Sequence, residues 1–225
     1  MFCTACSRPL RSVWAGWKRT CIPAEPDAGG AEAEACSSKK GVHNFNYPRT
    51  DPVVIMAVTS PDKSQILLGR QRVWPAKFYS CLAGFIESGE TVEEAVRREV
   101  YEEAGVECDE VIYHSSQPWP YPASLMLGCI AVAKEGQTIR CDLDNELEDA
   151  RFFTRDQVKA VLASSEIHLS RQELKKMDGS DGVDADAADK KKAEDEVLFR
   201  MPPVTAIAHT LIRAWAEGTY PGAKL

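Results

Sequence analysis

The chain has 225 residues, of which 44% are hydrophobic, and a net charge of −7 at pH 7. This length suits one domain with a substantial core plus a small appendage. The acidic balance argues against nonspecific nucleic-acid binding, which needs a basic surface, and no apolar run is long enough to span a membrane. Eight cysteines and an N-terminus without a signal-peptide core indicate thiols or metal ligands rather than disulfides.

Four of the eight cysteines lie in residues 1–48, where Cys3 and Cys6 form a CxxC pair. Four thiolates can hold a structural Zn²⁺ and fold a segment too small for its own core. The other two, Cys21 and Cys36, are separated by 14 residues that can loop out. We therefore expect a zinc-ribbon-like segment at 1–48 with these four ligands; the alternative is four unrelated reduced cysteines.

The elements after this segment follow from apolar runs and turn signals. Two runs flank a turn at 61–64 and predict buried strands, and a short strand is expected within 78–86. The two strands around this turn are Asp51–Ser60 and Gln65–Gly69. Later strands are predicted at Val111–Ser115, Leu125–Ala133 and Arg151–Thr154. Helices are expected at Arg155–Ser164 and Thr205–Gly218. Residues 170–196 are rich in Asp, Ala and Lys and are expected to form a disordered insertion.

A further helix is predicted between the third and fourth strands. Thr91 and Glu94 have the spacing of a capping box, and Gly105 can take the left-handed conformation that ends a helix. The helix should therefore run from Val92 to Ala104. Within it, every fourth residue from Val92 to Ala104 is apolar and forms one stripe.

Three glutamates lie along or just beyond the edge of that stripe: Glu99, Glu102 and Glu103. A helix whose carboxylates served only solubility would keep them away from its buried face, because unpaired buried charge is costly. Mutually repelling oxygen ligands at this spacing indicate a site for Mg²⁺ or Mn²⁺. Arg98 can pair with Glu102 one turn on. The alternative is an ordinary charged helix facing solvent.

Residues 116–126 read SQPWPYPASLM. Its prolines stiffen the backbone and are expected to place Trp119 and Tyr121 on alternate sides of an extended segment. Rigid aromatics can stack on flat rings, while Gln117 and Ser124 can hydrogen-bond a ribose or an amide. Taken alone, such a stretch is more often a buried loop.

Residues 84–106 fill every fixed position of the box that marks the Nudix hydrolases: Gly84, Glu90, Arg98-Glu99-Val100, Glu102-Glu103 and Gly105-Val106. The segment at 116–126 resembles the SQPWPxPxS element of the NADH pyrophosphatase (NAD diphosphatase) branch. The resemblance extends to the cysteines and to the segments YPRTDPVVI, LAGF and PPVTAIAHTLI. It implies an α+β fold, a Nudix α/β/α sandwich at 49–225 preceded by the zinc-ribbon segment. Members usually carry a further N-terminal domain.

The resemblance also implies a reaction, in which a metal-activated water attacks the pyrophosphate of NADH or NAD⁺ and yields (reduced) nicotinamide mononucleotide and AMP. Glu99, Glu102 and Glu103 would hold Mg²⁺ or Mn²⁺, with Glu103 closest to the chemistry. Glu146 matches a further metal-ligand position, and the alternative for it is a surface glutamate in an acidic loop. Phe85 would stack on nicotinamide, and Ala83 and Ala208 match positions where the backbone contacts substrate.

Other readings remain open at this point. The substrate could be ADP-ribose or the NAD cap of an RNA, or the domain could be a catalytically inactive nucleotide-binding module. The family is typically homodimeric, so a dimer is expected. The final residues Ala223-Lys224-Leu225 resemble a C-terminal address read by the peroxisomal import receptor, which predicts a peroxisomal location, with the cytoplasm as the alternative.

Overall fold

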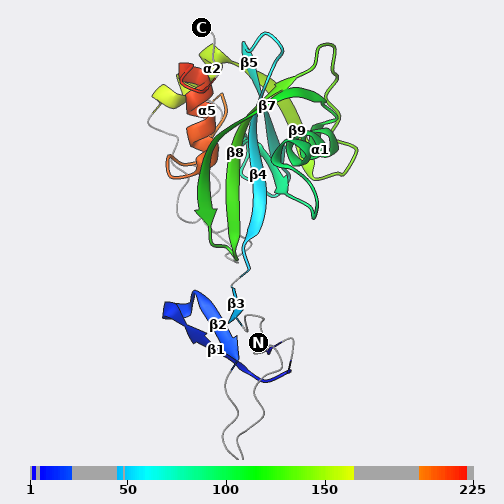
Figure 1. The fold of residues 1–225 in the computed structure, drawn as a ribbon. Coiled ribbons are helices and arrows are strands. Elements are labelled where there is room, and N and C mark those ends of the chain that lie inside the picture. Colours follow the sequence, from blue (N-terminus) through cyan, green and yellow to red (C-terminus); the bar gives the residue numbers. More distant parts are fainter. Residues whose placement is uncertain (1, 4–5, 22–44, 48, 165–197, 222–225) are drawn as a thin grey trace, which may run out of the picture. The chain divides into compact units, whose positions relative to one another are not determined.

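The computed structural model describes residues 2–3, 6–21, 45–47, 49–164 and 198–221. They form two compact units, Met1–Thr50 and Asp51–Leu225, which are described separately (Figure 1). The expected insertion at 170–196 lies outside the described residues, as do Cys36 and the C-terminal tripeptide.

The small unit is a three-stranded antiparallel sheet built around thiols. Its strands β1 (Leu10–Val13), β2 (Lys18–Cys21) and β3 (Phe45–Asn46) are ordered β1-β2-β3, and the 3₁₀ turn η1 (Trp14–Gly16) joins the first two. Its buried cluster consists of Cys3 and Cys21, with Cys6 and Leu10 packed against them. Among the described residues of this unit so few apolar side chains are buried that a further constraint, such as a metal, is expected to stabilise them.

The large unit is organised by a six-stranded mixed sheet. Its order is β7-β8-β4-β5-β9, with β6 also paired to β4. The strand β4 runs parallel to β8 and antiparallel to β5 and β6. The strands are β4 (Asp51–Thr59), β5 (Gln65–Gln71), β6 (Leu82–Phe85), β7 (Cys108–Trp119), β8 (Ser124–Ala133) and β9 (Leu147–Thr154).

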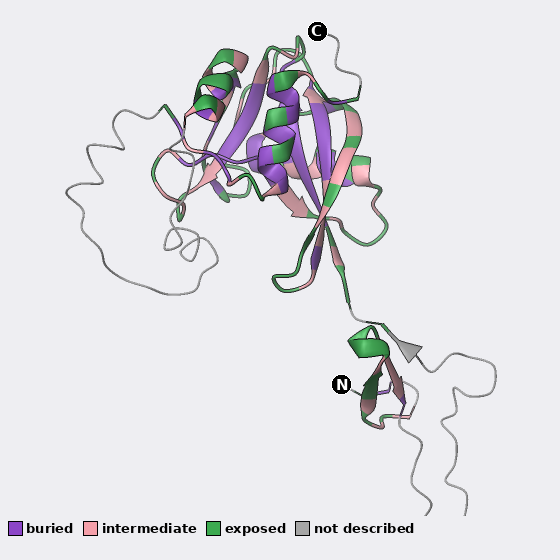
Figure 2. Ribbon diagram, turned by 90° about the vertical axis from the view of Figure 1, so that its left-hand side faces the viewer, coloured by how far each residue is buried: buried purple, intermediate pink, exposed green. Residues whose placement is uncertain are grey.

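Helices cover both faces of this sheet (Figures 1 and 2). Helix α1 (Val92–Ala104) packs on one face, and α2 (Arg155–Ala163) and α5 (Ile207–Glu217) pack on the other. Along β4, Ile55 and Ala57 belong to the α5-side core, whereas Val54, Met56 and Val58 belong to the α1-side core. This two-residue alternation in a fully apolar run is what a strand buried on both faces requires. The predicted α/β/α sandwich is confirmed.

Most element boundaries agree with the sequence prediction, and the largest difference is at β7. That strand continues past Ser115 to Trp119, because residues 115–119 pair with residues 124–128 of β8. Pro118 is tolerated there because β7 is an edge strand, where a missing N–H breaks no central ladder bond. In addition, β9 begins at Leu147 rather than Arg151, paired with β5. No helix in the described part of the chain is long and apolar enough to cross a membrane.

Candidate active site

Helix α1 presents the glutamates, and its ends are fixed by local signals. The Thr91 hydroxyl accepts a hydrogen bond from the Glu94 amide, and the Glu94 carboxylate accepts one from the Thr91 amide, so the predicted capping box is present. Gly105 ends the helix with φ = 66°. Of the predicted apolar stripe, Val96, Val100 and Ala104 are buried against the sheet and Val92 packs at its margin. The same face of α1 therefore directs Glu99 and Glu103 towards β6.

Glu99 lies directly over Gly84 of β6. A Cβ atom added to Gly84 would stand 1.9 Å from the Glu99 carboxyl carbon. Any side chain at position 84 would therefore displace the Glu99 carboxylate. The glycine that opens the sequence box is required by this close approach rather than by a turn.

Glu103 is the most deeply buried carboxylate among the described residues, with 2% of its surface exposed. Its Oε1 atom accepts a hydrogen bond from the Ala83 amide at 3.3 Å. Burial raises the pKa of Glu103 well above its usual range, and the negative charges of Glu146 and Glu99 raise it further. A buried carboxyl with one hydrogen bond and two acidic neighbours is costly to ionise unless a cation accompanies it.

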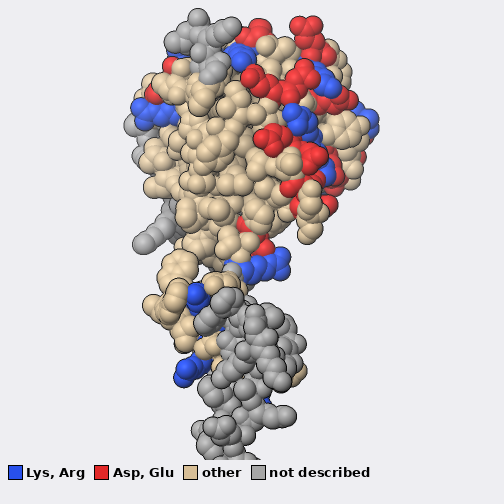
Figure 3. All heavy atoms as spheres, viewed as in Figure 1, with Lys and Arg blue, Asp and Glu red and all other residues tan. Residues whose placement is uncertain are grey.

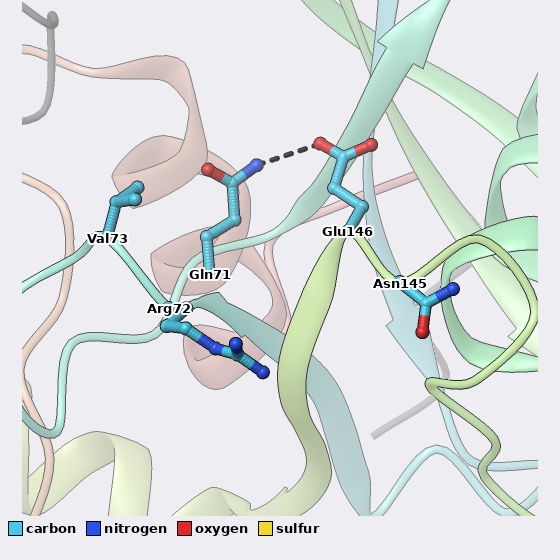
Figure 4. Close-up of a pocket in the computed structure, with 5 residues that line it drawn as sticks. All are labelled: Gln71, Arg72, Val73, Asn145 and Glu146. Atoms are coloured by element: carbon cyan, nitrogen blue, oxygen red, sulfur yellow. Dashed lines mark hydrogen bonds between the residues drawn. The ribbon is translucent and has the colours of Figure 1, made fainter.

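Glu146 reaches the same region from the start of β9. It lines an open pocket of about 590 Å³ together with Gln71, Arg72, Val73 and Asn145 (Figure 4). The Gln71 side-chain amide donates a hydrogen bond to Glu146 Oε1 at 2.8 Å. Burial and the charge of Asp144 raise the pKa of Glu146. The structure therefore brings the residue just before β9 close enough to α1 for its charge to act on Glu103, 43 positions away in sequence.

Arg98 holds several of the acidic groups together. Its guanidinium donates to Glu90 at 2.6 Å, to Glu99 at 2.8 Å and to Glu102 at 3.0 Å, and also to the Phe85 carbonyl at 2.8 Å. The predicted pair with Glu102 is thus present. Sequence reasoning missed the pair with Glu90, in which Arg98 lowers the pKa of Glu90 to about 2. Glu90 and Arg98 are eight residues apart and meet only because the loop before α1 folds back.

The donor set fits a divalent cation. Burial raises the pKa of Glu99 despite its contact with Arg98, with further contributions from Glu102 and Glu146. Carboxylate oxygens are the ligands that Mg²⁺ and Mn²⁺ prefer, and a cation would offset the mutual repulsion. Among the described residues, however, the one cluster of three candidate ligands within 4.8 Å of one another is Cys3, Cys6 and Cys21. The glutamate oxygens do not converge to that degree.

The sheet register places most of the expected substrate-binding residues on one face. Gln117 is paired with Met126, Met126 with Val53, and Val53 with Phe85, so their side chains share the face on which α5 packs. Trp119, Ser124 and Ala83 belong to the same face by the two-residue repeat. Phe85 is 58% exposed, whereas Ser124 is buried. Ala208 is also buried, in the α5-side core, where its carbonyl accepts from the Cys81 thiol.

The Pro-rich segment at 116–126 differs from the prediction in where its aromatic rings lie and in what Gln117 contacts. Trp119 and Tyr121 were expected on alternate sides, which is wrong: their rings are in edge-to-face contact, with centroids 6.1 Å apart. The reason is that the strand ends at Trp119 and Tyr121 lies in the turn to β8. The Gln117 side chain already makes hydrogen bonds within the protein. Its oxygen accepts one from the Ile207 amide at 2.7 Å, and its nitrogen donates one to the Thr205 carbonyl at 2.8 Å.

The cysteine cluster of the small unit forms a second candidate metal site. The Sγ atoms of Cys3, Cys6 and Cys21 all lie within 4.8 Å of one another, and those of Cys6 and Cys21 are 3.3 Å apart. Three converging thiols from a CxxC turn and a strand are typical donors for tetrahedral Zn²⁺. The expected fourth ligand, Cys36, is outside the described residues.

This chain belongs to the Nudix family, since the NUDIX domain model matches residues 49–172. It is 44% identical over 214 residues to the human "NAD-capped RNA hydrolase NUDT12", covering 95% of this chain and 37% of that protein. It is 42% identical over 224 residues to the Schizosaccharomyces pombe "NAD-capped RNA hydrolase", covering 100% of this chain and 52% of that one. Human "NAD(P)H pyrophosphatase NUDT13, mitochondrial" is 35% identical over 218 residues, covering 96% and 50%. The chain thus spans about half or less of the length of these relatives.

Proposed function

We propose that this chain hydrolyses the pyrophosphate bond of NADH and NAD⁺, giving (reduced) nicotinamide mononucleotide and AMP, in a reaction that depends on Mg²⁺ or Mn²⁺. Relatives named for NAD caps and for NAD(P)H support the substrate class. The 5′ end of an NAD-capped RNA contains the same pyrophosphate bond, within the cap, so removal of NAD caps is part of the proposal.

The observation that carries this proposal is the pair of contacts made by β6. Over three successive residues, the Ala83 amide bonds to buried Glu103, Gly84 lies under Glu99, and Phe85 exposes its ring. One short strand therefore joins the acidic cluster to an aromatic surface. A dinucleotide needs both, because its phosphates require charge compensation and its nicotinamide ring can stack on an aromatic side chain.

In this proposal the four glutamates Glu99, Glu102, Glu103 and Glu146 hold the divalent cation. The cation, when bound, neutralises phosphate charge and lowers the pKa of a water molecule. Arg98 restrains Glu99 and Glu102 through its ion pairs with both. Glu103 is the most deeply buried of the four and accepts a hydrogen bond from the Ala83 amide, so we assign it the position closest to the metal–water chemistry.

Substrate choice tests this proposal. NADH and ADP-ribose share the pyrophosphate, so the glutamates cannot distinguish them, and discrimination must come from the nicotinamide ring. Stacking of a base on an aromatic side chain contributes roughly 1–3 kcal/mol, so kcat/KM should be about five- to 150-fold higher for NADH. Phe85→Ala and Trp119→Ala should reduce this ratio, while Tyr113→Ala, an exposed aromatic elsewhere on β7, should not.

The outcomes separate the alternatives. A wild-type preference for ADP-ribose would contradict the NADH assignment while leaving a Nudix hydrolase. Absence of turnover on every nucleoside diphosphate tested, with nucleotide binding retained, would instead indicate an inactive binding module.

We also propose one structural Zn²⁺ per chain on Cys3, Cys6, Cys21 and Cys36. Elemental analysis of protein purified without chelator should find about one zinc per chain. Cys21→Ser should lose it. Cys81→Ser serves as the control, because Cys81 is buried in the core of the large unit. Zinc-free protein with a folded small unit would contradict the site.

The remaining proposals concern assembly and location. A homodimer is proposed from the family resemblance. Sedimentation analysis tests it, and a monomer would contradict it.

Peroxisomal import through residues 223–225 is proposed from the tripeptide Ala-Lys-Leu. A fluorescent protein fused ahead of the chain should form puncta that disperse when Leu225 is deleted. Diffuse signal from both would favour the cytoplasm.

A further inference from the structure

The pocket beside Glu146 has an arginine on its wall. Besides Glu146, the residues that line this pocket are Gln71, Arg72, Val73 and Asn145 (Figure 4). The Arg72 guanidinium makes no ion pair or hydrogen bond within the part of the chain that the structure describes. An arginine that stays unpaired in a pocket it shares with a carboxylate has all of its donors available to a ligand.

The two residues before Arg72 both have partners in the protein. Arg70 forms an ion pair with Glu148 at 2.9 Å, and the Gln71 amide donates to Glu146 at 2.8 Å. Figure 4 shows Gln71 turned towards Glu146 and the Arg72 side chain extending in another direction. Because Gln71 already restrains the Glu146 carboxylate, Arg72 is left as an exposed cation beside it.

The arginine lies directly after an irregularity in the ladder between β5 and β9. The successive β5 residues Arg70 and Gln71 are paired with Asp149 and Leu147, so the register skips one residue of β9. Bulges of this kind re-aim side chains and are over-represented next to active sites. The irregular end of β5 therefore fits a binding role for Arg72 better than a purely structural one.

The charge of the site favours a cation at this position. Acidic side chains gather over the side of the large unit on which α1 lies (Figure 3), and the pyrophosphate of a dinucleotide brings further negative charge. The Arg98 guanidinium is already shared by Glu90, Glu99 and Glu102. A second guanidinium outside that network can compensate phosphate charge without releasing any of these carboxylates.

We propose that the Arg72 guanidinium binds the pyrophosphate group of the dinucleotide in the pocket that Glu146 lines, which rests on the function proposed above and deepens it. The planar fork of an arginine matches phosphate oxygens and can donate two parallel hydrogen bonds to them. NADH, NADPH and ADP-ribose all carry this group. Arg72 therefore contributes affinity for each of them, and the choice among them is left to the contacts with their other parts.

Binding is measured on the full chain by isothermal titration calorimetry with α,β-methylene-ADP and Mg²⁺. This pyrophosphate analogue has a carbon in place of the bridging oxygen and resists hydrolysis there. Arg72→Gln should raise Kd about tenfold or more, because hydrogen bonds to a charged group are lost. Arg72→Lys should restore only part of the affinity, since an ammonium keeps the charge but not the planar fork.

Arg213→Gln is the matched control for this change. Arg213 is an exposed arginine of α5 that pairs with Glu217 at 2.7 Å, outside the pocket. Its replacement removes the same charge from the same unit, so a general electrostatic effect of net charge would appear in both variants. Arg213→Gln should bind the analogue as the wild type does.

A kinetic readout separates the pyrophosphate from other phosphate groups. In Arg72→Gln, kcat/KM should fall by the same factor for NADH, NADPH and ADP-ribose. A loss confined to NADPH would overturn the assignment in favour of its 2′-phosphate. If the wild type hydrolyses none of these but Arg72→Gln still binds the analogue more weakly than Arg213→Gln does, the proposed function fails and the phosphate site stands. Equal Kd values in these two variants, or a wild type without affinity for the analogue, overturn the site.

Discussion

At the scale of single residues, the chemistry depends on how tightly the carboxylates are enclosed. Glu103 lies in the interior with one backbone hydrogen bond, and Glu99 occupies the space left by the missing side chain of Gly84. Arg98 pairs with Glu90, Glu99 and Glu102, and no ion pair with Glu103 is found among the described residues. Glu103 is therefore the group whose ionisation depends most on an added cation.

Glu103→Gln tests that dependence in two directions. The amide has the same shape but no charge, so turnover should fall by roughly 10²-fold or more. The free energy of unfolding of the metal-free protein at neutral pH should rise, because a buried carboxylate without a cation is costly. Activity and urea denaturation are measured on the same preparations.

The matched control for this change is Glu107→Gln. Glu107 is an exposed glutamate paired with Lys134 at 2.8 Å, and its replacement should leave both quantities nearly unchanged. Unaltered kcat in Glu103→Gln at saturating Mg²⁺ would remove Glu103 from the mechanism.

Gly84→Ala tests the close approach of β6 to Glu99. The new methyl group should push the Glu99 carboxylate aside, since its carboxyl carbon would otherwise be 1.9 Å away. The tip of a long side chain can move, so we expect little loss of stability, weaker activation by Mg²⁺ and lower activity. Gly136→Ala is the converse control, because its φ of 71° strains an alanine but no atom lies near. It should cost about 1 kcal/mol of stability and no activity. Equal activity in the two variants would contradict the assignment of Glu99.

At the scale of elements, features that depend on local sequence signals were predicted correctly. Features that depend on long-range pairing were not. The ends of α1 could be predicted because Thr91, Glu94 and Gly105 act within one turn of the residues they cap. The extension of β7 to Trp119 could not, because it depends on pairing with β8 across the hairpin. The contacts of Gln117 with α5 span about 90 positions, and the sequence alone favoured a substrate contact for that residue.

Gln117 therefore provides a test of what orders the start of α5. Ala206, the N-cap residue, makes no side-chain cap hydrogen bond, and Gln117 bonds to the next amide instead. Gln117→Leu should lower the free energy of unfolding by about 1–3 kcal/mol, since it leaves the Ile207 amide and the Thr205 carbonyl without this partner. Gln137→Leu, in an exposed loop bond, is the control and should cost much less. An unchanged stability with a raised KM for NADH would instead assign Gln117 to substrate binding.

At the scale of the whole molecule, we expect the proposed metal binding and the stability of the protein to be coupled through pH. The pKa values of Glu103, Glu99 and Glu146 are all raised in the folded state, chiefly by burial. Between the pKa of the unfolded carboxyls, about 4.5, and the raised folded values, the folded state binds more protons than the unfolded state. Stability from these groups is therefore fully present below pH 4.5 and is lost as pH rises through the folded pKa values.

The expected outcome is that protein dialysed free of Mg²⁺ and Mn²⁺ becomes less stable as the pH rises above about 4.5. The slope contributed by one carboxyl is at most about 1.4 kcal/mol per pH unit, and Glu103→Gln should remove that contribution. Adding Mg²⁺ at pH 7.5 should restore stability to the wild type more than to the variant. Urea denaturation over this range measures both effects. The same pH dependence in wild type and Glu103→Gln would contradict the raised pKa of Glu103.

The most direct test of the central claim is the identity of the products formed from NADH. With Mg²⁺ or Mn²⁺ present, chromatography should show equal amounts of reduced nicotinamide mononucleotide and AMP, and dialysis of these ions away should stop the reaction. This result would assign the cleavage to the pyrophosphate and show that it depends on a divalent cation. Formation of nicotinamide and ADP-ribose, or product formation that continues without a divalent cation, would contradict the account.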